Sequence, residues 1–575
     1  MLKILKFLKP YTAQVIFILL LMFVQTLSDL YLPTLMAKLV DVGIVNGDSS
    51  YIINTGAFML IVAAGGALSS ICASFLSSRT SLGMARKFRE KVFARVESFS
   101  LNEFNKLGTS TLIIRTTNDI TQIQQVVVMM LRMMLTAPLM FIGGIIMAYS
   151  EDKYLTLLLL GAVPFLAALM FFVAKKGFPL FKLMQVKLDK LNQILREGLT
   201  GIRVIRAFNR EEYQSKRFDE ANTDLMQNAI KVNKIMAFLL PAIMLIMNMT
   251  TLAIMWFGGI RIEAGAIQVG SLMAFIQYAM MIMFSLVMVT MIFVIVPRAE
   301  ASADRINEVL ELAVDIKDPG SPKTGDGSKG YIEFMDVSFS YPGASEPAIC
   351  NISFKTGPGE MTAIIGGTGS GKSTLINLIP RLYDVQKGSI LVDGVDVREI
   401  SQGNLRSKIG FVPQKSVLFT GTISDNIRFG KKEASFEEIV KAAETAQAVE
   451  FISELKNGYD HMVSQGGANF SGGQKQRLSI ARALVKKPEI LIFDDSFSAL
   501  DFKTDSKLRA ALREETLGAT VLIVTQRVST VMDADRIIVL DEGAIECVGN
   551  HKELMKSCEV YREIVKSQLS EEESA

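Results

Sequence analysis

Six apolar stretches in the first half of the chain constrain its fold more than any other feature. A transmembrane helix needs about 20 mostly apolar residues, and six segments meet this requirement: 13–37, 52–78, 126–149, 154–174, 235–260 and 270–296. The residues after Arg298 have the pattern of a soluble α/β protein. We therefore predict a membrane α-helical bundle followed by a soluble domain.

The links between these stretches indicate how the bundle is oriented. Three links are short and carry few cations (41–50, 150–153 and 261–268), whereas two are long and basic (79–125 and 175–234). Basic links preferentially remain in the cytoplasm. We therefore expect a multi-pass protein of the cell membrane, with the two long links and both chain termini in the cytoplasm.

The two long links have the composition of helices. They contain few helix breakers, so we expect them to carry the membrane helices into the cytoplasm, at about 1.5 Å per residue. Turns are expected near 102–108 and 208–213, where Gly108 and Asn209 favour them. A separate cytoplasmic domain in each link is the alternative, and the absence of a strand pattern argues against it.

Charge and cysteine content argue against two kinds of site. The net charge of +3 is small for 575 residues, so nothing indicates a nucleic-acid-binding surface. The four cysteines are far apart and form no CxxC pair: Cys72, Cys350, Cys547 and Cys558. We expect them to be reduced packing residues, with neither a zinc site nor a disulfide framework.

The segment 306–330 separates the two halves of the chain. It contains two clusters of glycine, proline and serine, a composition typical of a linker. We therefore assign residues 1–305 to a transmembrane domain with six helices and two long cytoplasmic loops. Residues 331–575 form the soluble domain. Its expected strands are 331–341, 361–365, 389–392, 409–413, 490–493 and 521–524, several of them continuous apolar runs that suit a buried parallel sheet.

A glycine-rich loop follows the second of these strands. It fits the phosphate-binding pattern G-x4-G-K-[ST] in the required strand–loop–helix context, with the residues Gly366, Gly367, Thr368, Gly369, Ser370, Gly371, Lys372, Ser373 and Thr374. Backbone N–H groups and Lys372 would hold the phosphates of ATP, and Ser373 would bind Mg²⁺. Asp494, which ends an apolar strand, is the matching carboxylate on the metal side.

A second motif carries a family resemblance. The run Phe470-Ser471-Gly472-Gly473-Gln474 resembles the signature sequence of ATP-binding cassette (ABC) proteins. Six spans followed by one such domain resemble an ABC half-exporter over essentially the whole chain. The resemblance implies a fold of ABC exporter type, with a cytoplasmic α/β P-loop nucleotide-binding domain. It also implies that two chains pair, with ATP between the phosphate loop of one and the signature of the other.

The resemblance implies roles for three further residues. Tyr341 matches the aromatic residue that stacks on adenine, and Asp501 closes the match to the D-loop. Gln414 matches the Q-loop glutamine, which senses Mg²⁺ and the membrane domain. Segments 109–119 and 197–208 resemble the two intracellular loops of ABC exporters.

The sequence departs from the family pattern at two positions that concern hydrolysis. Asp495 occupies the place of the glutamate that activates the attacking water, and Gln526 occupies the place of the switch histidine. The shorter Asp495 side chain withdraws its carboxylate by about 1 Å, a displacement that can cost on the order of 10²-fold in rate. Gln526 can donate to the γ-phosphate but does not titrate near neutrality. Harmless drift is the alternative interpretation of each change.

Together these observations predict the degenerate-site subunit of a bacterial heterodimeric exporter. The catalytic candidates of its own site, Asp495 and Gln526, are poor, whereas its signature, Ser471–Gln474, is intact. A homodimer would contain two impaired sites. A partner with a catalytic glutamate and histidine would restore one of them, so hydrolysis is expected mainly at the partner's site.

The spans suggest the substrate class only in outline. They are rich in methionine, which suits varied amphipathic ligands or simple gap-filling between helices: Met129, Met130, Met133, Met134, Met280, Met281, Met283, Met288 and Met291, with Phe284 and Phe293. Asp29, within the first span, either lines the pathway or pairs with a neighbouring helix. We expect export of amphipathic drugs or lipids. The alternatives are a dedicated peptide or lipid-precursor exporter, or an ATP-gated regulatory or channel-like subunit without turnover.

Overall fold

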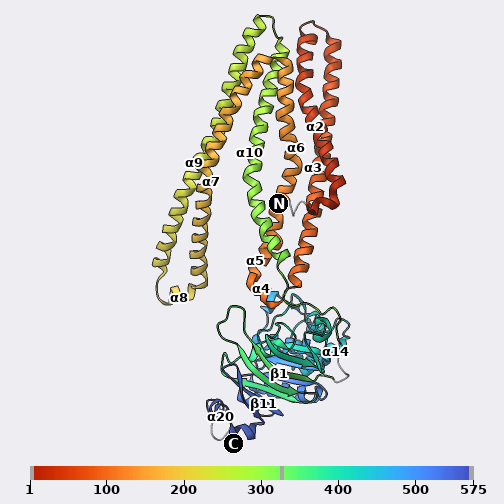
Figure 1. Ribbon diagram of the computed structural model, residues 1–575, viewed down its shortest axis with the longest axis vertical. Coiled ribbons are helices and arrows are strands. Elements are labelled where there is room, and N and C mark those ends of the chain that lie inside the picture. Colours follow the sequence, from red (N-terminus) through yellow and green to blue (C-terminus); the bar gives the residue numbers. More distant parts are fainter. Residues whose placement is uncertain (1–5, 324–328, 569–575) are drawn as a thin grey trace. The chain divides into compact units, whose positions relative to one another are not determined.

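The computed structural model describes residues 6–323 and 329–568 (Figure 1). Side chains are described from Leu8 onward, except at 290–295, 297 and 298. Met291 and Phe293 therefore lie outside the described side chains, as does the second glycine cluster of the linker. The chain divides into two compact units, residues 1–97 with 109–312 and residues 98–108 with 313–575, and each is described by itself.

The first unit contains the six predicted membrane-crossing helices, which the described residues confirm by length and composition. Helices suit the interior of a lipid bilayer, because each helix satisfies its own backbone hydrogen bonds where no water is present. The elements are η1 (Lys6–Tyr11), α2 (Thr12–Lys38), η2 (Leu39–Ile44), α3 (Ser49–Glu97), α5 (Thr109–Ile114), η3 (Arg115–Asp119), α6 (Ile120–Glu151), α7 (Lys153–Thr200), α8 (Ile202–Ala207), α9 (Glu211–Glu263) and α10 (Val269–Glu311).

The long basic links do extend these helices. Helices α7 and α9 contain 48 and 53 residues, which corresponds to lengths of about 70–80 Å. Helix α10 continues to Glu311, so residues 306–311, which the sequence placed in the linker, are helical. A short helix, α4 (Leu101–Leu107), occupies the first expected turn, and α8 ends directly before the second.

Within the first unit the helices form two groups. Helices α2, α3, α6 and α10 pack on one another, whereas α7 and α9 run side by side as a second pair that packs on α6 and α10 at one end (Figure 1). Within the larger group, a partly buried ion pair near α5 joins η3 to α10. The fully buried Asp119 of η3 accepts hydrogen bonds from Ser302 (2.9 Å) and from Arg305 Nε (2.8 Å), both on α10.

The second unit is built on three sheets. The central sheet has the order β12-β11-β3-β10-β9-β6, in which β12 alone is antiparallel to its neighbour, and a four-stranded antiparallel sheet has the order β2-β1-β4-β5. The strands are β1 (Ile332–Phe339), β2 (Ile349–Thr356), β3 (Met361–Gly366), β4 (Lys387–Val392), β5 (Val395–Asp396), β6 (Ile409–Val412), β7 (Gly421–Thr422), β8 (Met462–Val463), β9 (Ile490–Asp494), β10 (Thr520–Val524), β11 (Arg536–Asp541) and β12 (Ala544–Gly549). All six predicted strands are present, but those near 331–341 and 389–392 belong to the antiparallel sheet.

Helices flank these sheets. They are α11 (Lys372–Leu378), α12 (Gln402–Lys408), α13 (Ile423–Arg428), α14 (Phe436–Thr445), α15 (Val449–Ser453), α16 (Gly472–Leu484), α17 (Phe502–Glu515), α18 (Val528–Val531), α19 (His551–Ser557) and α20 (Glu559–Lys566), with the short 3-10 turns η4 (Gly458–Asp460) and η5 (Gln465–Gly467). Strand β9 is buried at every position and β3 at all but its first. The loops that follow the carboxyl ends of β3 and β9 are therefore anchored to a buried core.

The tip helix α4 belongs to the second unit although it lies between two membrane helices in the sequence. Ser100 caps it, and the Glu103 side chain returns a hydrogen bond to the Ser100 N–H (2.6 Å). The other Glu103 oxygen accepts from the N–H of Asp315 (3.1 Å), and Leu101 packs against the core of the unit. This loop is thus fastened to the soluble domain of its own chain.

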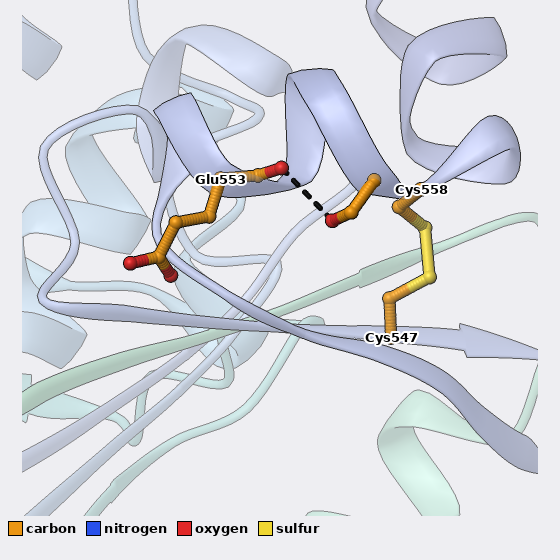
Figure 2. Close-up of a disulfide and its surroundings, with 4 residues drawn as sticks. Cys547, Glu553 and Cys558 are labelled. Atoms are coloured by element: carbon orange, nitrogen blue, oxygen red, sulfur yellow. Dashed lines mark hydrogen bonds between the residues drawn. A yellow bond between two sulfur atoms is a disulfide. The ribbon is translucent and has the colours of Figure 1, made fainter.

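The prediction of four reduced cysteines was wrong for two of them. Cys547 of β12 and Cys558, between α19 and α20, form a disulfide (Figure 2). Only Asn550 separates β12 from the short helix α19, and this connection brings two residues that are 11 apart in sequence to a Cα–Cα distance of 6.2 Å, which is within the range that a disulfide requires. Cys72 and Cys350 are free.

Candidate functional site

The glycine-rich loop joins the buried end of β3 to α11. Gly369 and Gly371 have φ values of 87° and 91°, a conformation that glycine adopts without steric cost. A Cβ atom on Gly366 would lie 2.1 Å from the carbonyl oxygen of Leu540. The loop conformation therefore depends on its glycines. Lys372 lies across this loop and donates to the carbonyl oxygens of Gly366 (2.9 Å) and Gly367 (2.6 Å).

A carboxylate and a hydroxyl meet beside this loop. Ser373 Oγ donates to Asp494 Oδ1 at 2.9 Å, and Asp494 is 6% exposed at the end of β9. Burial raises the pKa of Asp494; the neighbouring Asp495 adds to the rise, whereas Ser373 and Lys372 oppose it. Burial lowers the pKa of Lys372, against the attraction of both carboxylates. The site thus brings the ammonium group of Lys372 close to the carboxyl groups of Asp494 and Asp495 in partly buried surroundings.

These two oxygen ligands suit Mg²⁺, which is commonly bound through one or two carboxylates together with substrate phosphates and water. Among the described residues no group of three or more His, Cys, Asp or Glu side chains could hold a metal by itself. A cation here would therefore depend on Ser373, Asp494 and the phosphates of a nucleotide. Gln414 lies at the same edge, and its Nε2 is 3.4 Å from Asp495 Oδ2.

The two unusual residues lie at the ends of neighbouring parallel strands. Asp495 directly follows β9, and Gln526 is the second residue after β10. The backbone N–H of Asp495 donates to the carbonyl oxygen of Val524 (2.8 Å). Asp495 has a φ of 45°, a left-handed conformation that aspartate adopts more readily than most residues. Its backbone geometry therefore suits the residue present.

Most of the predicted residues line one pocket of about 330 Å³, a volume typical of small-molecule sites. The lining comprises Tyr341, Ala348, Thr368–Thr374, Gln414, Asp494, Asp495, Val524, Thr525 and Gln526. Tyr341 lies at its edge, and its hydroxyl is 3.0 Å from Thr374 Oγ1. Gly366 and Gly367 shape the loop but do not line the pocket. Ala348, Val524 and Thr525 were not predicted; only the proximity of Thr525 to Gln526 could have indicated one of them.

The predicted signature lies outside this pocket. Ser471 is exposed and caps α16: its Oγ accepts from the Gln474 N–H (3.3 Å), while Gln474 Oε1 accepts from the Ser471 N–H (2.9 Å). Gly472 is open to solvent, and a Cβ atom on Gly473 would lie 3.0 Å from the Ala499 carbonyl oxygen. Asp501 is also exposed and caps α17 through the N–H of Thr504 (2.9 Å). These residues do not complete the pocket of their own chain.

Comparisons with known proteins agree with this arrangement. Residues 15–286 match the family described as ABC transporter transmembrane region, and residues 349–498 match the family described as ABC transporter. The chain is 44% identical over 564 residues to an uncharacterized ABC transporter ATP-binding protein of Mycobacterium tuberculosis, with 97% of each chain covered. It is 35% identical over 485 residues to the ATP-dependent lipid A-core flippase of Desulfotalea psychrophila, with 84% of each chain covered.

A solved structure extends the likeness to the complete fold. The structure of a bacterial Atm1-family ABC exporter with ATP bound superposes with a TM-score of 0.81 at 27% identity, covering 98% of this chain and 99% of that one. The helices, the P-loop pocket and these relatives lead to one conclusion. The chain belongs to the ABC transporter family, as an exporter that carries its transmembrane region and its ATPase domain on one polypeptide.

Proposed function

We propose that this chain is one subunit of a dimeric exporter that binds ATP with Mg²⁺ in the pocket described above. Lys372 and the loop 366–374 hold the phosphates, Ser373 and Asp494 hold Mg²⁺ with Gln414 nearby, and Tyr341 stacks on adenine. This assignment is supported by the 2.9 Å contact between Ser373 and Asp494 and by the pocket lining. Both termini and the ATPase domain lie in the cytoplasm, where ATP is available.

The proposal further makes this chain the degenerate-site subunit of a heterodimer. The observation that carries it is the composition of the pocket: both departures, Asp495 and Gln526, line it, whereas the intact signature 471–474 lies elsewhere. A general base must reach the proton that it removes, and the Asp495 carboxylate is one methylene short. The partner supplies a glutamate and a histidine for its own site, and this chain completes that site with Ser471, Gly472, Gly473 and the nearby Asp501.

The tip helix α8 supports the presence of a second chain. Val204, Phe208 and Tyr213, on and beside α8, are 61%, 73% and 63% exposed. Apolar residues gathered at the tip of a long helical pair indicate an interaction site. The first tip, α4, already packs on the soluble unit of its own chain through Leu101. The partner's ATPase domain is the proposed contact of α8.

The test of this proposal is co-purification of the chain with the product of a neighbouring half-exporter gene, followed by ATPase assays of the chain alone and of the pair. We expect little hydrolysis by the chain alone and substantial, drug-stimulated hydrolysis by the pair. Equal turnover by the chain alone would instead support a homodimer. No turnover in either preparation would support an ATP-gated subunit without hydrolysis.

The proposed substrates are amphipathic drugs or lipids taken from the cytoplasm or the inner leaflet. A flippase for lipid A-core among the relatives supports a lipid-like substrate, and methionine-rich spans suit varied apolar ligands. Dedicated export of a peptide or lipid precursor is the second candidate. Asp29 of α2 is half-buried and hydrogen-bonded to Gln25, one turn earlier in the same helix.

Replacing Asp29 by asparagine is expected to reduce transport of cationic dyes about three- to fivefold while leaving neutral dyes unchanged. One charge acting at about 4 Å in a wet cavity contributes about 1 kcal/mol. The measurement is efflux from vesicles loaded with a cationic and a neutral dye, compared with the parent protein. Unchanged efflux of both dyes would leave Asp29 as a structural residue.

A further inference from the structure

One residue near the C-terminus binds the segment that carries Gln526. Gln568 follows α20, and its Nε2 donates to the carbonyl oxygen of Gln526 (2.7 Å), while its Oε1 accepts from the N–H of Val528 (3.0 Å). An amide side chain offers both a donor and an acceptor. Gln568 uses both on the backbone of one three-residue segment, so it fixes the orientation of that segment as well as its position.

Further hydrogen bonds confine the same segment, here called the switch segment (525–528). Thr525 Oγ1 accepts from the N–H of Arg527 (3.0 Å), and Arg527 Nη2 donates to the carbonyl oxygen of Ser498 (2.6 Å). Gln526 itself is exposed and lines the nucleotide pocket. The direction of the Gln526 side chain therefore depends on its backbone, which β10 fixes on the N-terminal side and Gln568 fixes on the C-terminal side.

The helix that precedes Gln568 is firmly anchored. Tyr561 and Val565 of α20 are fully buried in a cluster with Ala363 and Ile365 of β3. The Tyr561 hydroxyl is 2.7 Å from His551 Nδ1 on α19. At the start of α20 the disulfide between Cys558 and Cys547 joins the helix pair to β12 (Figure 2). The covalent link and Gln568 thus lie at opposite ends of α20.

We propose that Gln568 is a positioning residue that directs Gln526 toward the γ-phosphate of ATP, and that the Cys547–Cys558 disulfide holds the helix that presents Gln568. The proposal rests on the proposed role of this pocket in ATP binding. The two hydrogen bonds of Gln568 to the switch segment are here called the clamp. Because ADP lacks the γ-phosphate, the clamp raises the affinity for ATP and leaves the affinity for ADP unchanged. The disulfide makes the preference for ATP over ADP sensitive to the redox state of Cys547 and Cys558.

The redox step is a thiol–disulfide exchange with a dithiol reductant. The S–S bond of the protein breaks, both cysteines become thiols, and the dithiol forms its own disulfide, supplying two electrons and two protons. Cys558 is 1% exposed, whereas Cys547 is partly exposed and gives the reductant access. Disulfides in compartments that contain reducing thiols commonly serve as redox sensors.

The experiment measures photolabelling of the purified full-length chain by azido-ATP, with competition by ATP or ADP in Mg²⁺ on ice. Gln568→Ala should lower the ATP-to-ADP affinity ratio about tenfold, the value of one hydrogen bond to a charged group. Gln568→Glu should act similarly, because it keeps an acceptor for Val528 but loses the donor to Gln526. Lys566→Ala, an exposed change at the same helix end, is the matched control and should leave the ratio unchanged.

Two further arms separate the possible failures. Gln526→Ala must lower the ratio; if it does not, the assigned role of Gln526 is wrong and the positioning role of Gln568 falls with it. If Gln526→Ala lowers the ratio and Gln568→Ala does not, the clamp alone is overturned. Dithiol treatment, or Cys547→Ser, should lower the ratio of the parent protein but not that of Gln568→Ala. An equal effect of reduction on both proteins would overturn the anchoring role of the disulfide.

Discussion

Replacing Lys372 by alanine is expected to weaken ATP binding to this chain by about 10- to 100-fold, the loss of a charge-assisted contact to the phosphates. Lys372 is 8% exposed and now donates to carbonyl oxygens of the glycine-rich loop. Burial lowers its pKa, but an incoming triphosphate adds negative charge and favours the protonated form. Lys372 is thus held where the phosphates of ATP would bind.

The measurement is equilibrium nucleotide binding to the purified chain. Lys387→Ala is the control, because Lys387 is exposed on β4 of the antiparallel sheet. Thermal unfolding without nucleotide should be similar for parent and variants, which separates lost binding from lost folding. Unchanged affinity in Lys372→Ala would contradict the assignment of the pocket to ATP.

The membrane half of the fold could be predicted from composition because a bilayer permits few solutions. A segment of about 20 apolar residues must be a helix there, since its backbone groups find no water. The helical extensions followed from the absence of breakers in the long links. The end of α10 did not, because residues 306–311 are polar enough to resemble the linker that follows.

The pocket was predictable wherever a local motif determines the geometry. Within the loop 366–374, Gly366 leaves no room for a side chain and Gly369 and Gly371 have positive φ values. Asp494 and Gln526 are positioned by the ends of parallel strands. Contacts between distant segments were not predictable. Cys547 and Cys558 meet because of how α19 folds back, and Gln568 reaches the switch segment only through the packing of α20. No spacing in the sequence signals either contact.

Replacing Gly473 by leucine is expected to reduce the ATPase activity of the assembled pair at least about 100-fold. In the proposed dimer the signature brings its backbone N–H groups to the partner's γ-phosphate, and loss of such donors commonly costs 10²–10³-fold in rate. Even a Cβ atom on Gly473 would lie 3.0 Å from the backbone oxygen of Ala499. A branched side chain would therefore displace the signature as well as block the nucleotide. Gly518→Leu is the control, because nothing lies within 4 Å of a Cβ atom there.

Replacing Asp495 by asparagine in the same pair should change steady-state ATPase by no more than about twofold, since it removes a base that is too short to reach its water. The contrast between the two variants tests the asymmetry of the dimer. Gly473 serves the partner's competent site, whereas Asp495 serves the impaired site of its own chain. If Asp495→Asn stops turnover as completely as Gly473→Leu, this site is catalytically essential. A homodimer that uses Asp495 as its base would then be the better account, because one kind of site would contain both the base and the signature on which hydrolysis depends.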